Sequence, residues 1–312
     1  MAKLLSIVNL LGQTIAAHPI FIAEARRSGW ARTARSFRRA STRTFVLTVI
    51  VAVFAWGAIS LLAALSQRAD PWLRANLDEY QIYVIMLIAS FLGGLWLDFH
   101  SLSASINAVS GEISTGRWDL LRLTALNDSG LIAAKHAASQ LRVWRGLIGI
   151  VGIRLGLSVI GAIIILRDAT GLSVRNMGGS AIGVVVSGLL VTFLLALLYL
   201  LEPFWRVRAV TAFGVYVSVR ERNTTSALLS AIFGLFALWL AQAILLGSVS
   251  MGLIFAVVPL LFGFTAVGTS YVFSLFCNGL FIILFISAVY GFHHLVERWS
   301  LRQARRRLKL LN

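Results

Sequence analysis

The chain alternates long apolar stretches with short polar segments that are rich in arginine. An apolar stretch of about 20 residues can cross the hydrocarbon core of a bilayer as a helix. By this rule the pattern predicts six membrane spans, at 45–65, 81–105, 143–166, 178–201, 228–248 and 271–293. The predicted fold class is therefore an all-α polytopic membrane protein, with residues 1–312 forming a single transmembrane domain.

The charges between the predicted spans indicate the orientation. Basic residues concentrate in 18–43, 202–222 and the tail 297–312, whereas the segment 66–80 holds two arginines against three acidic residues. Because basic loops stay on the cytoplasmic side, we expect both termini there, in the plasma membrane of a prokaryotic cell. The apolar middle of the basic region 202–222, at 210–219, is expected to lie along the interface as a short separate helix.

Residues 223–296 contain no Asp, Glu, Lys or Arg and could hold three spans by length alone. Since basic segments flank this stretch on both sides, an even number of crossings is expected. We therefore predict two spans joined by a re-entrant segment at 251–269, which contains Pro259, Gly263 and Gly268. A seven-span arrangement with the tail outside is the alternative.

The segment 18–43 is predicted to be a basic amphipathic helix at the membrane surface. Arg32, Arg35 and Arg39 recur on one face, and Trp30 and Phe37 lie on another. Arginines would face anionic headgroups and the aromatic rings would face acyl chains. A topology anchor explains this helix, and so does a brace that also touches a cytoplasmic partner. The basic tail is expected to bind membrane lipid electrostatically.

Composition supports the membrane class. The chain is 58% hydrophobic and only 13% charged, whereas a soluble domain carries about a quarter charged residues. The net charge of +16 is placed between spans, which indicates topology and not nucleic-acid binding. Cys277 is the single cysteine and the five histidines show no metal-site spacing, so we expect no metal.

Charged residues fall inside two of the predicted spans. Asp98 lies on the second span and Arg154 on the third. A charge in the hydrocarbon region is costly unless it is paired or hydrated. The two side chains are therefore candidates for a structural ion pair or for contacts that line a substrate path; no mutual contact is the third possibility.

The segment 111–130 is the polar interruption with the most internal pattern. Glu112 precedes a glycine turn, and an amphipathic run follows at 118–123. Gly111 and Gly116 have the spacing of a phosphate-binding loop, but Arg117 and Trp118 replace the required Lys and Ser/Thr. We therefore expect no Walker A motif, no ATP site and no catalytic residues in this chain.

These residues resemble a known family. Glu112, Gly116, the run Trp118-Asp119-Leu120-Leu121-Arg122-Leu123-Thr124 and the pair Ala134-Lys135 are similar to the permease subunits of ABC-2 type transporters. The expected layout, with an amphipathic helix before the first span and a re-entrant segment before the sixth, is also similar. The chain departs from the family at Thr124-Ala125-Leu126, where the family usually has a central proline.

The resemblance implies an ATP-driven exporter in which this chain is the non-enzymatic permease. ATP and Mg would be bound by a separate cytoplasmic ABC ATPase subunit, and a second permease, identical or related, would complete the path. The contacts with the ATPase would be made by the coupling region, through Glu112, Gly116, Arg117, Trp118, Asp119, Leu120, Leu121, Arg122 and Thr124.

Two other classes stay open. One is a membrane scaffold subunit of a larger complex, in which the basic surfaces only set topology. The other is a membrane-embedded enzyme acting on lipids, which would need Asp98, His100 or Glu202 around a water-filled cleft.

Overall fold

The computed structural model describes residues 19–27, 34–69, 79–116, 128–171, 180–221, 223–265 and 271–310. All regular structure within these ranges is helical. The helices are α2 (Pro19–Arg27), α3 (Ala34–Ala69), α5 (Glu79–Ile106), α6 (Ser110–Ser114), α8 (Asp128–Gly171), α9 (Ser180–Arg220), α10 (Thr224–Thr265) and α11 (Tyr271–Leu310).

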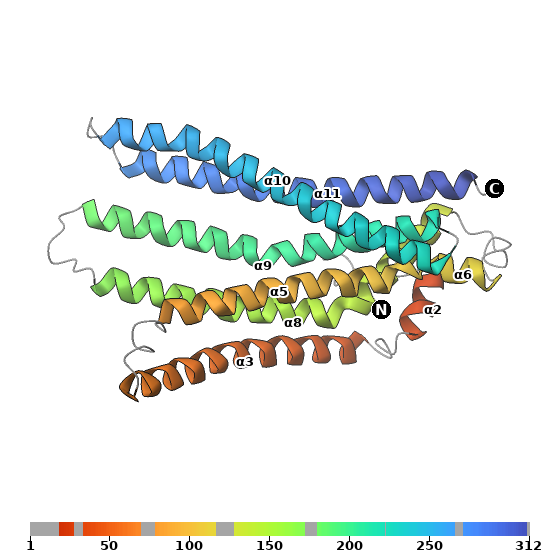
Figure 1. The fold of residues 1–312 in the computed structure, drawn as a ribbon, viewed down its shortest axis with the longest axis horizontal. Helices are drawn as coiled ribbons and strands as arrows, with labels where there is room; N and C mark the ends of the chain where they lie inside the picture. The colour runs from red at the N-terminus through yellow and green to blue at the C-terminus, as the bar shows by residue number, and fades with distance from the viewer. Residues whose placement is uncertain are drawn as a thin grey trace.

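The long helices lie side by side as an elongated bundle (Figure 1). The short helices α2 and α6 and the C-terminal end of α11 lie at the same end of the bundle, which is called the α6 end below. Helix α8 packs against α3, α5, α9 and α2, while α10 packs against α11, α9 and α5.

Four helical stretches among the described residues are long and apolar enough to cross a membrane. They are Arg39–Leu61, Tyr80–Ile113, Gly130–Arg167 and Thr225–Leu245. Half of the most apolar part of the third stretch is buried inside the bundle, against 6% for the first. The chain is thus a helical protein with several membrane-spanning candidates, in which α8 is central and α3 is peripheral.

The central position of α8 relies on Gly149, Gly152 and Gly156, whose spacing places them as a stripe on one side of the helix and predicts close helix packing. A Cβ atom at Gly152 would overlap the hydroxyl oxygen of Thr48, and one at Gly156 would lie 2.8 Å from the Cβ of Ala52. These glycines let the backbones of α8 and α3 approach closely. A third glycine of the stripe, Gly149, has more room.

Helix α9 differs from the sequence prediction. It runs without interruption from Ser180 to Arg220, so 210–219 is part of the bundle and no separate interfacial helix forms. Val210, Ala212, Val215, Val217 and Val219 are all buried. The physical reason is that both sides of this stretch are apolar and find partners in other helices, whereas an interfacial helix buries only one face.

Helix α10 also differs from the prediction. One continuous helix covers the predicted fifth span and the residues up to Thr265, where a re-entrant segment at 251–269 was expected. The stretch from 224 to 265 holds no charged residue. An apolar helix of this length therefore has no charged side chain that would favour a return to the surface. Residues 266–269 lie outside the described part.

The basic segment at 18–43 is divided. Helix α2 ends at Arg27, and α3 begins at Ala34 and continues directly into the first predicted span. The prediction of a helix lying on the membrane surface can therefore hold only for the part before Ala34, because residues 34–43 belong to the same helix as the first predicted span. Ile20 and Phe21 of α2 are buried in the core that surrounds α8.

Candidate functional site

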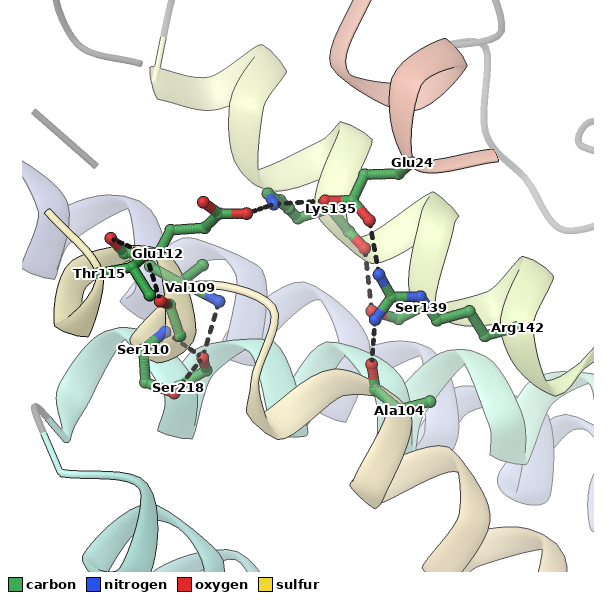
Figure 2. Close-up of polar contacts among 11 residues, drawn as sticks. Glu24, Ala104, Val109, Ser110, Glu112, Thr115, Lys135, Ser139, Arg142 and Ser218 are labelled. Carbon is green, nitrogen blue, oxygen red and sulfur yellow. Dashed lines mark hydrogen bonds and ion pairs between the residues drawn. The ribbon is translucent and has the colours of Figure 1, made fainter. Parts of the chain in front are cut away.

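The candidate site is at the α6 end, where four charged side chains from three helices meet. Glu24 comes from α2, Glu112 from α6, and Lys135 and Arg142 from α8. We call these four residues the α6-end cluster (Figure 2). They carry two positive and two negative charges, so the cluster is electrically balanced.

Lys135 is the centre of the α6-end cluster. Its ammonium nitrogen lies 2.7 Å from Glu24 Oε1 and 3.1 Å from Glu112 Oε1. The lysine is only 3% exposed. Because a buried ammonium group is costly unless it is paired and hydrogen-bonded, these two carboxylates are required partners. One side chain thus ties α2 and α6 to α8.

Arg142 completes the cluster two turns further along α8. Its guanidinium donates to Glu24 Oε2 and, at 3.3 Å, to the backbone carbonyl of Ala104 on α5. Burial opposes ionisation of Glu24, but the hydrogen bonds and charges of Lys135 and Arg142 outweigh it and lower the pKa of this carboxyl group below its ordinary value of 4.5. Glu24 is therefore ionised at neutral pH.

Helix α6 is also attached to α9. The backbone N–H groups of Val109 and Ser110 donate to the hydroxyl oxygen of Ser218, at 2.9 and 2.8 Å. Since the first N–H groups of a helix have no partner inside it, this serine satisfies two donors that would otherwise be buried without one. The backbone then turns at Gly116, whose φ of 68° favours glycine.

The predicted coupling residues are thus described only at their beginning. Glu112 and Gly116 lie in the described part, where Glu112 pairs with Lys135 and the backbone turns at Gly116. Arg117, Trp118, Asp119, Leu120, Leu121, Arg122 and Thr124 fall in 117–127, which lies outside it. Ala134, next to Lys135, is fully buried in the core.

The two charges predicted inside spans have partners other than each other. Asp98 Oδ2 lies 2.6 Å from an Arg206 nitrogen and accepts a hydrogen bond from Trp239 Nε1 at 2.8 Å. Arg154 lies 2.7 Å from Glu202, and Glu202 also pairs with Arg206 at 3.2 Å. Asp98 and Arg154 are therefore joined through two residues of α9, and we call the four charged residues the buried charge network.

A proline supplies a further acceptor for this network. Pro203 lies inside α9 and has no N–H group, so the carbonyl of Tyr199, four residues earlier, has no helical donor. Arg154 donates to that carbonyl at 2.7 Å, and its guanidinium lies 4.5 Å from the centre of the Tyr199 ring. The network consequently links α5, α8 and α9 at a point where α9 has lost a backbone bond.

The other candidate residues take varied positions. Trp30 and Arg32 fall outside the described part, Arg35 and Phe37 belong to the first turns of α3, and Arg39 is exposed. His100 stacks on Trp96. Among the described residues, no group of three or more His, Cys, Asp and Glu side chains could hold a metal ion.

Sequence reasoning missed Glu24, Arg206 and the structural role of Glu202. Glu24 had a visible signal, because it is the only acidic residue before Asp70, within a strongly basic stretch. Glu202 and Arg206 have the i, i+4 spacing of a helical ion pair. That signal was hidden because 202–222 was assigned to a connection between spans.

Comparisons with protein-family models, with curated proteins and with solved structures found no match to this chain.

Proposed function

We propose that the chain is the permease subunit of an ATP-driven exporter of the ABC-2 type, driven by a separate ATPase that binds the segment 111–130. The observation that carries the proposal is the attachment of this segment at its start. Glu112 is held by Lys135 of the central helix α8, and Lys135 is held in turn by Glu24 of α2. The similarity of Glu112, Gly116 and Lys135 to the family pattern is the second support.

This attachment suits the transmission of force. A push on 117–127 reaches α6 through the turn at Gly116, then α8 through Lys135 and α9 through Ser218. The buried charge network connects the same two long helices to α5 through Asp98 and Arg206. In the proposed mechanism, closure of the ATPase shifts α5, α8 and α9 together and opens the path on the opposite side.

The proposal includes the finer topology. Six spans would place both termini and the α6 end in the cytoplasm, where the ATPase and its MgATP are available. A second copy or a related permease would complete the path. The exposed apolar faces of α3, α5 and α10 offer the surface for lipid and for that subunit, with Leu47, Ile88 and Phe233 among the exposed residues.

The test is co-purification from the native membrane. Wild type is compared with a Trp118→Ala/Asp119→Lys variant and with a second double variant, Arg305→Ala/Arg307→Glu, which serves as the control on the exposed side of α11. We expect a P-loop ATPase to co-purify with wild type and with the control and to be lost from the Trp118/Asp119 variant.

The reconstituted complex gives a second measurement. ATP hydrolysis by the partner should depend on the permease, and the Trp118/Asp119 variant should abolish that dependence. If no ATPase accompanies either wild type or control, the exporter proposal fails, and a scaffold subunit becomes the better description of the chain.

A further inference from the structure

A groove of about 370 Å³ lies on the surface of α11 near its C-terminal end. It is lined by Leu295, Arg298, Trp299, Arg302, Gln303 and Arg306. The three arginines recur every four residues, so they form one stripe along the helix. Trp299 is fixed beside them by an edge contact with Tyr216, at 5.3 Å between ring centres.

These exposed arginines differ from the buried and half-buried charges of the bundle. The charges of the α6-end cluster and of the buried charge network are all balanced by neighbours. Within the described residues, no ion pair involves Arg298, Arg302 or Arg306, and all three are exposed. Three positive charges in one groove without a carboxylate partner indicate an anionic ligand.

The position of the groove along α11 indicates which anion. Leu284 and Leu295 are exposed apolar residues, at 51% and 69%, and their spacing of eleven residues places them on one side of the helix. Arg302 and Arg306 continue the same stripe, and Arg302 lies about 10 Å beyond Leu295 along the helix axis. Along the helix the apolar face therefore leads past Leu295 to Arg298 and Trp299, which lie within one turn of it, and then to Arg302 and Arg306.

From this order we infer that the α11 groove binds the headgroup of an anionic phospholipid, with the acyl chains lying along Leu284 and Leu295. Tryptophan is favoured at the membrane interface, and arginine beyond it binds phosphate oxygens bidentately. A free phosphate ion would use only the arginines. An acidic protein partner would not account for the continuous apolar face that adjoins the arginines.

The inference requires only that the chain is in a membrane, so it stands independently of the exporter proposal. It also goes beyond electrostatic attraction of a basic tail. The helix carries three further cations nearby, Arg305, Arg307 and Lys309, which are exposed but do not line the groove. Diffuse electrostatic attraction would depend equally on both sets of cations, whereas binding at a defined site would depend mainly on the three groove arginines.

The chain thus offers a charge-matched test. The delipidated full-length protein in neutral detergent is titrated with phosphatidylglycerol or with phosphatidylcholine of the same acyl chains, and bound lipid is measured by native mass spectrometry. Wild type should prefer phosphatidylglycerol. Arg298→Gln/Arg302→Gln/Arg306→Gln should weaken this binding on the order of 100-fold, and Arg305→Gln/Arg307→Gln/Lys309→Gln by less than about threefold.

Equal losses in the two triple variants, or no lipid preference in wild type, would overturn the inference. Displacement of phosphatidylglycerol by equimolar inorganic phosphate would indicate a free-anion site instead. If the groove variant binds lipid normally but loses a co-purifying protein, the surface is a protein contact and the inference fails. Melting temperatures without added lipid identify any variant that is misfolded.

A position-specific measurement keeps the inference testable even if the triple variant does not fold. A fluorophore is placed in the groove by Gln303→Cys in a Cys277→Ser background. Phosphatidylglycerol with a nitroxide near the headgroup should quench it at lower concentration than the matched phosphatidylcholine. The same fluorophore at position 305 should show no such difference, and equal quenching at both positions would contradict a defined site.

Discussion

At the scale of the residue, Lys135 shows how one buried charge can hold several helices together. It is almost inaccessible to water and holds two carboxylates that belong to helices far apart in the chain. Removal of one partner from a buried ion pair leaves the other charge desolvated without compensation. The stability of the α6 end should therefore depend on this side chain more than on any exposed cation.

Lys135→Met should lower the free energy of unfolding by about 3–5 kcal/mol, because Glu112 loses its ion-pair partner and Glu24 keeps only Arg142. Unfolding of the purified protein in mixed micelles with increasing SDS measures this. Arg43→Met, at an exposed position of α3, is the control and should change the value by less than about 0.5 kcal/mol. Equal effects of the two variants would contradict the role assigned to Lys135.

Glu24 makes the same cluster sensitive to acid. Its pKa is lowered in the folded protein, so the ionised carboxylate contributes stability in full above the ordinary value of 4.5. This contribution is lost as the pH falls from 4.5 through the lowered pKa. Melting temperatures between pH 7 and pH 3 should therefore fall more steeply for wild type than for Glu24→Gln.

The control for this pH dependence is Glu221→Gln. Glu221 pairs with Arg220, whose side chain is more than half exposed. Because Glu221 lies outside the α6-end cluster, the comparison separates the loss of a carboxyl group in general from the loss of Glu24 in particular. A Glu24→Gln variant with the slope of wild type would show that other carboxyl groups dominate the acid response.

Arg206 is, like Lys135, a buried cation that pairs with two carboxylates, here Asp98 and Glu202 of the buried charge network. Arg206→Met would leave Asp98 with only the Trp239 hydrogen bond and Glu202 with only Arg154. We expect a loss of about 3–5 kcal/mol in the free energy of unfolding. Adding Asp98→Asn should restore part of that loss, because the stranded negative charge disappears. No recovery in the double variant would contradict the pairing.

At the scale of the element, the contact of α3 with α8 depends on the absence of side chains. Gly152 lies so close to Thr48 that even a methyl group cannot fit without movement. Thr48 already donates its hydroxyl hydrogen bond to the backbone carbonyls of Thr44 or Phe45. A larger residue at 152 must therefore push α3 outward or break this local bond.

Gly152→Ala should lower the melting temperature of the purified protein, by an amount that corresponds to about 1–3 kcal/mol of overpacking. Gly57→Ala is the matched control, since no atom lies within 4 Å of the position of its added methyl group. The control should be neutral or slightly stabilising, because alanine has the higher helix propensity. An unchanged melting temperature for Gly152→Ala would show that the two helices are not in close contact.

At the scale of the whole molecule, the α6 end and the opposite end should be on different sides of the membrane. Tyr80 and Thr115 lie at the two ends of the stretch formed by α5 and α6, and the 26 residues from Tyr80 to Ser105 alone rise about 38 Å. This exceeds the roughly 30 Å of the hydrocarbon core. The C-terminal part of α11 shares the α6 end (Figure 1).

Single cysteines at positions 80, 115 and 305, in a Cys277→Ser background, test this arrangement. A membrane-impermeant thiol reagent added to sealed right-side-out vesicles should label position 80 and leave 115 and 305 unlabelled. Inverted vesicles should give the reverse. Labelling of 115 and 305 from opposite sides would contradict the shared end and would favour an odd number of crossings.

The lengths of the apolar stretches predicted part of the architecture from the sequence. The helical class and the spans at 45–65, 81–105, 143–166 and 228–248 have counterparts among the four apolar helical stretches. Apolar length alone requires these elements, because a helix satisfies its own backbone in lipid. The close approach at Gly152 and Gly156 also followed from local spacing. Such features depend on residues near one another in the chain.

Tertiary structure alone decided the partners of the buried charges. Nothing in the local sequence connects Glu24 with Lys135, or Asp98 with Arg206, because more than a hundred residues separate each pair. It also decided that 210–219 is core and that the helix from Thr224 continues to Thr265. Local pattern shows how much of a helix is apolar. The packing of helices that are distant in the chain determines which neighbour covers that surface. It therefore also determines which charge can be buried beside it.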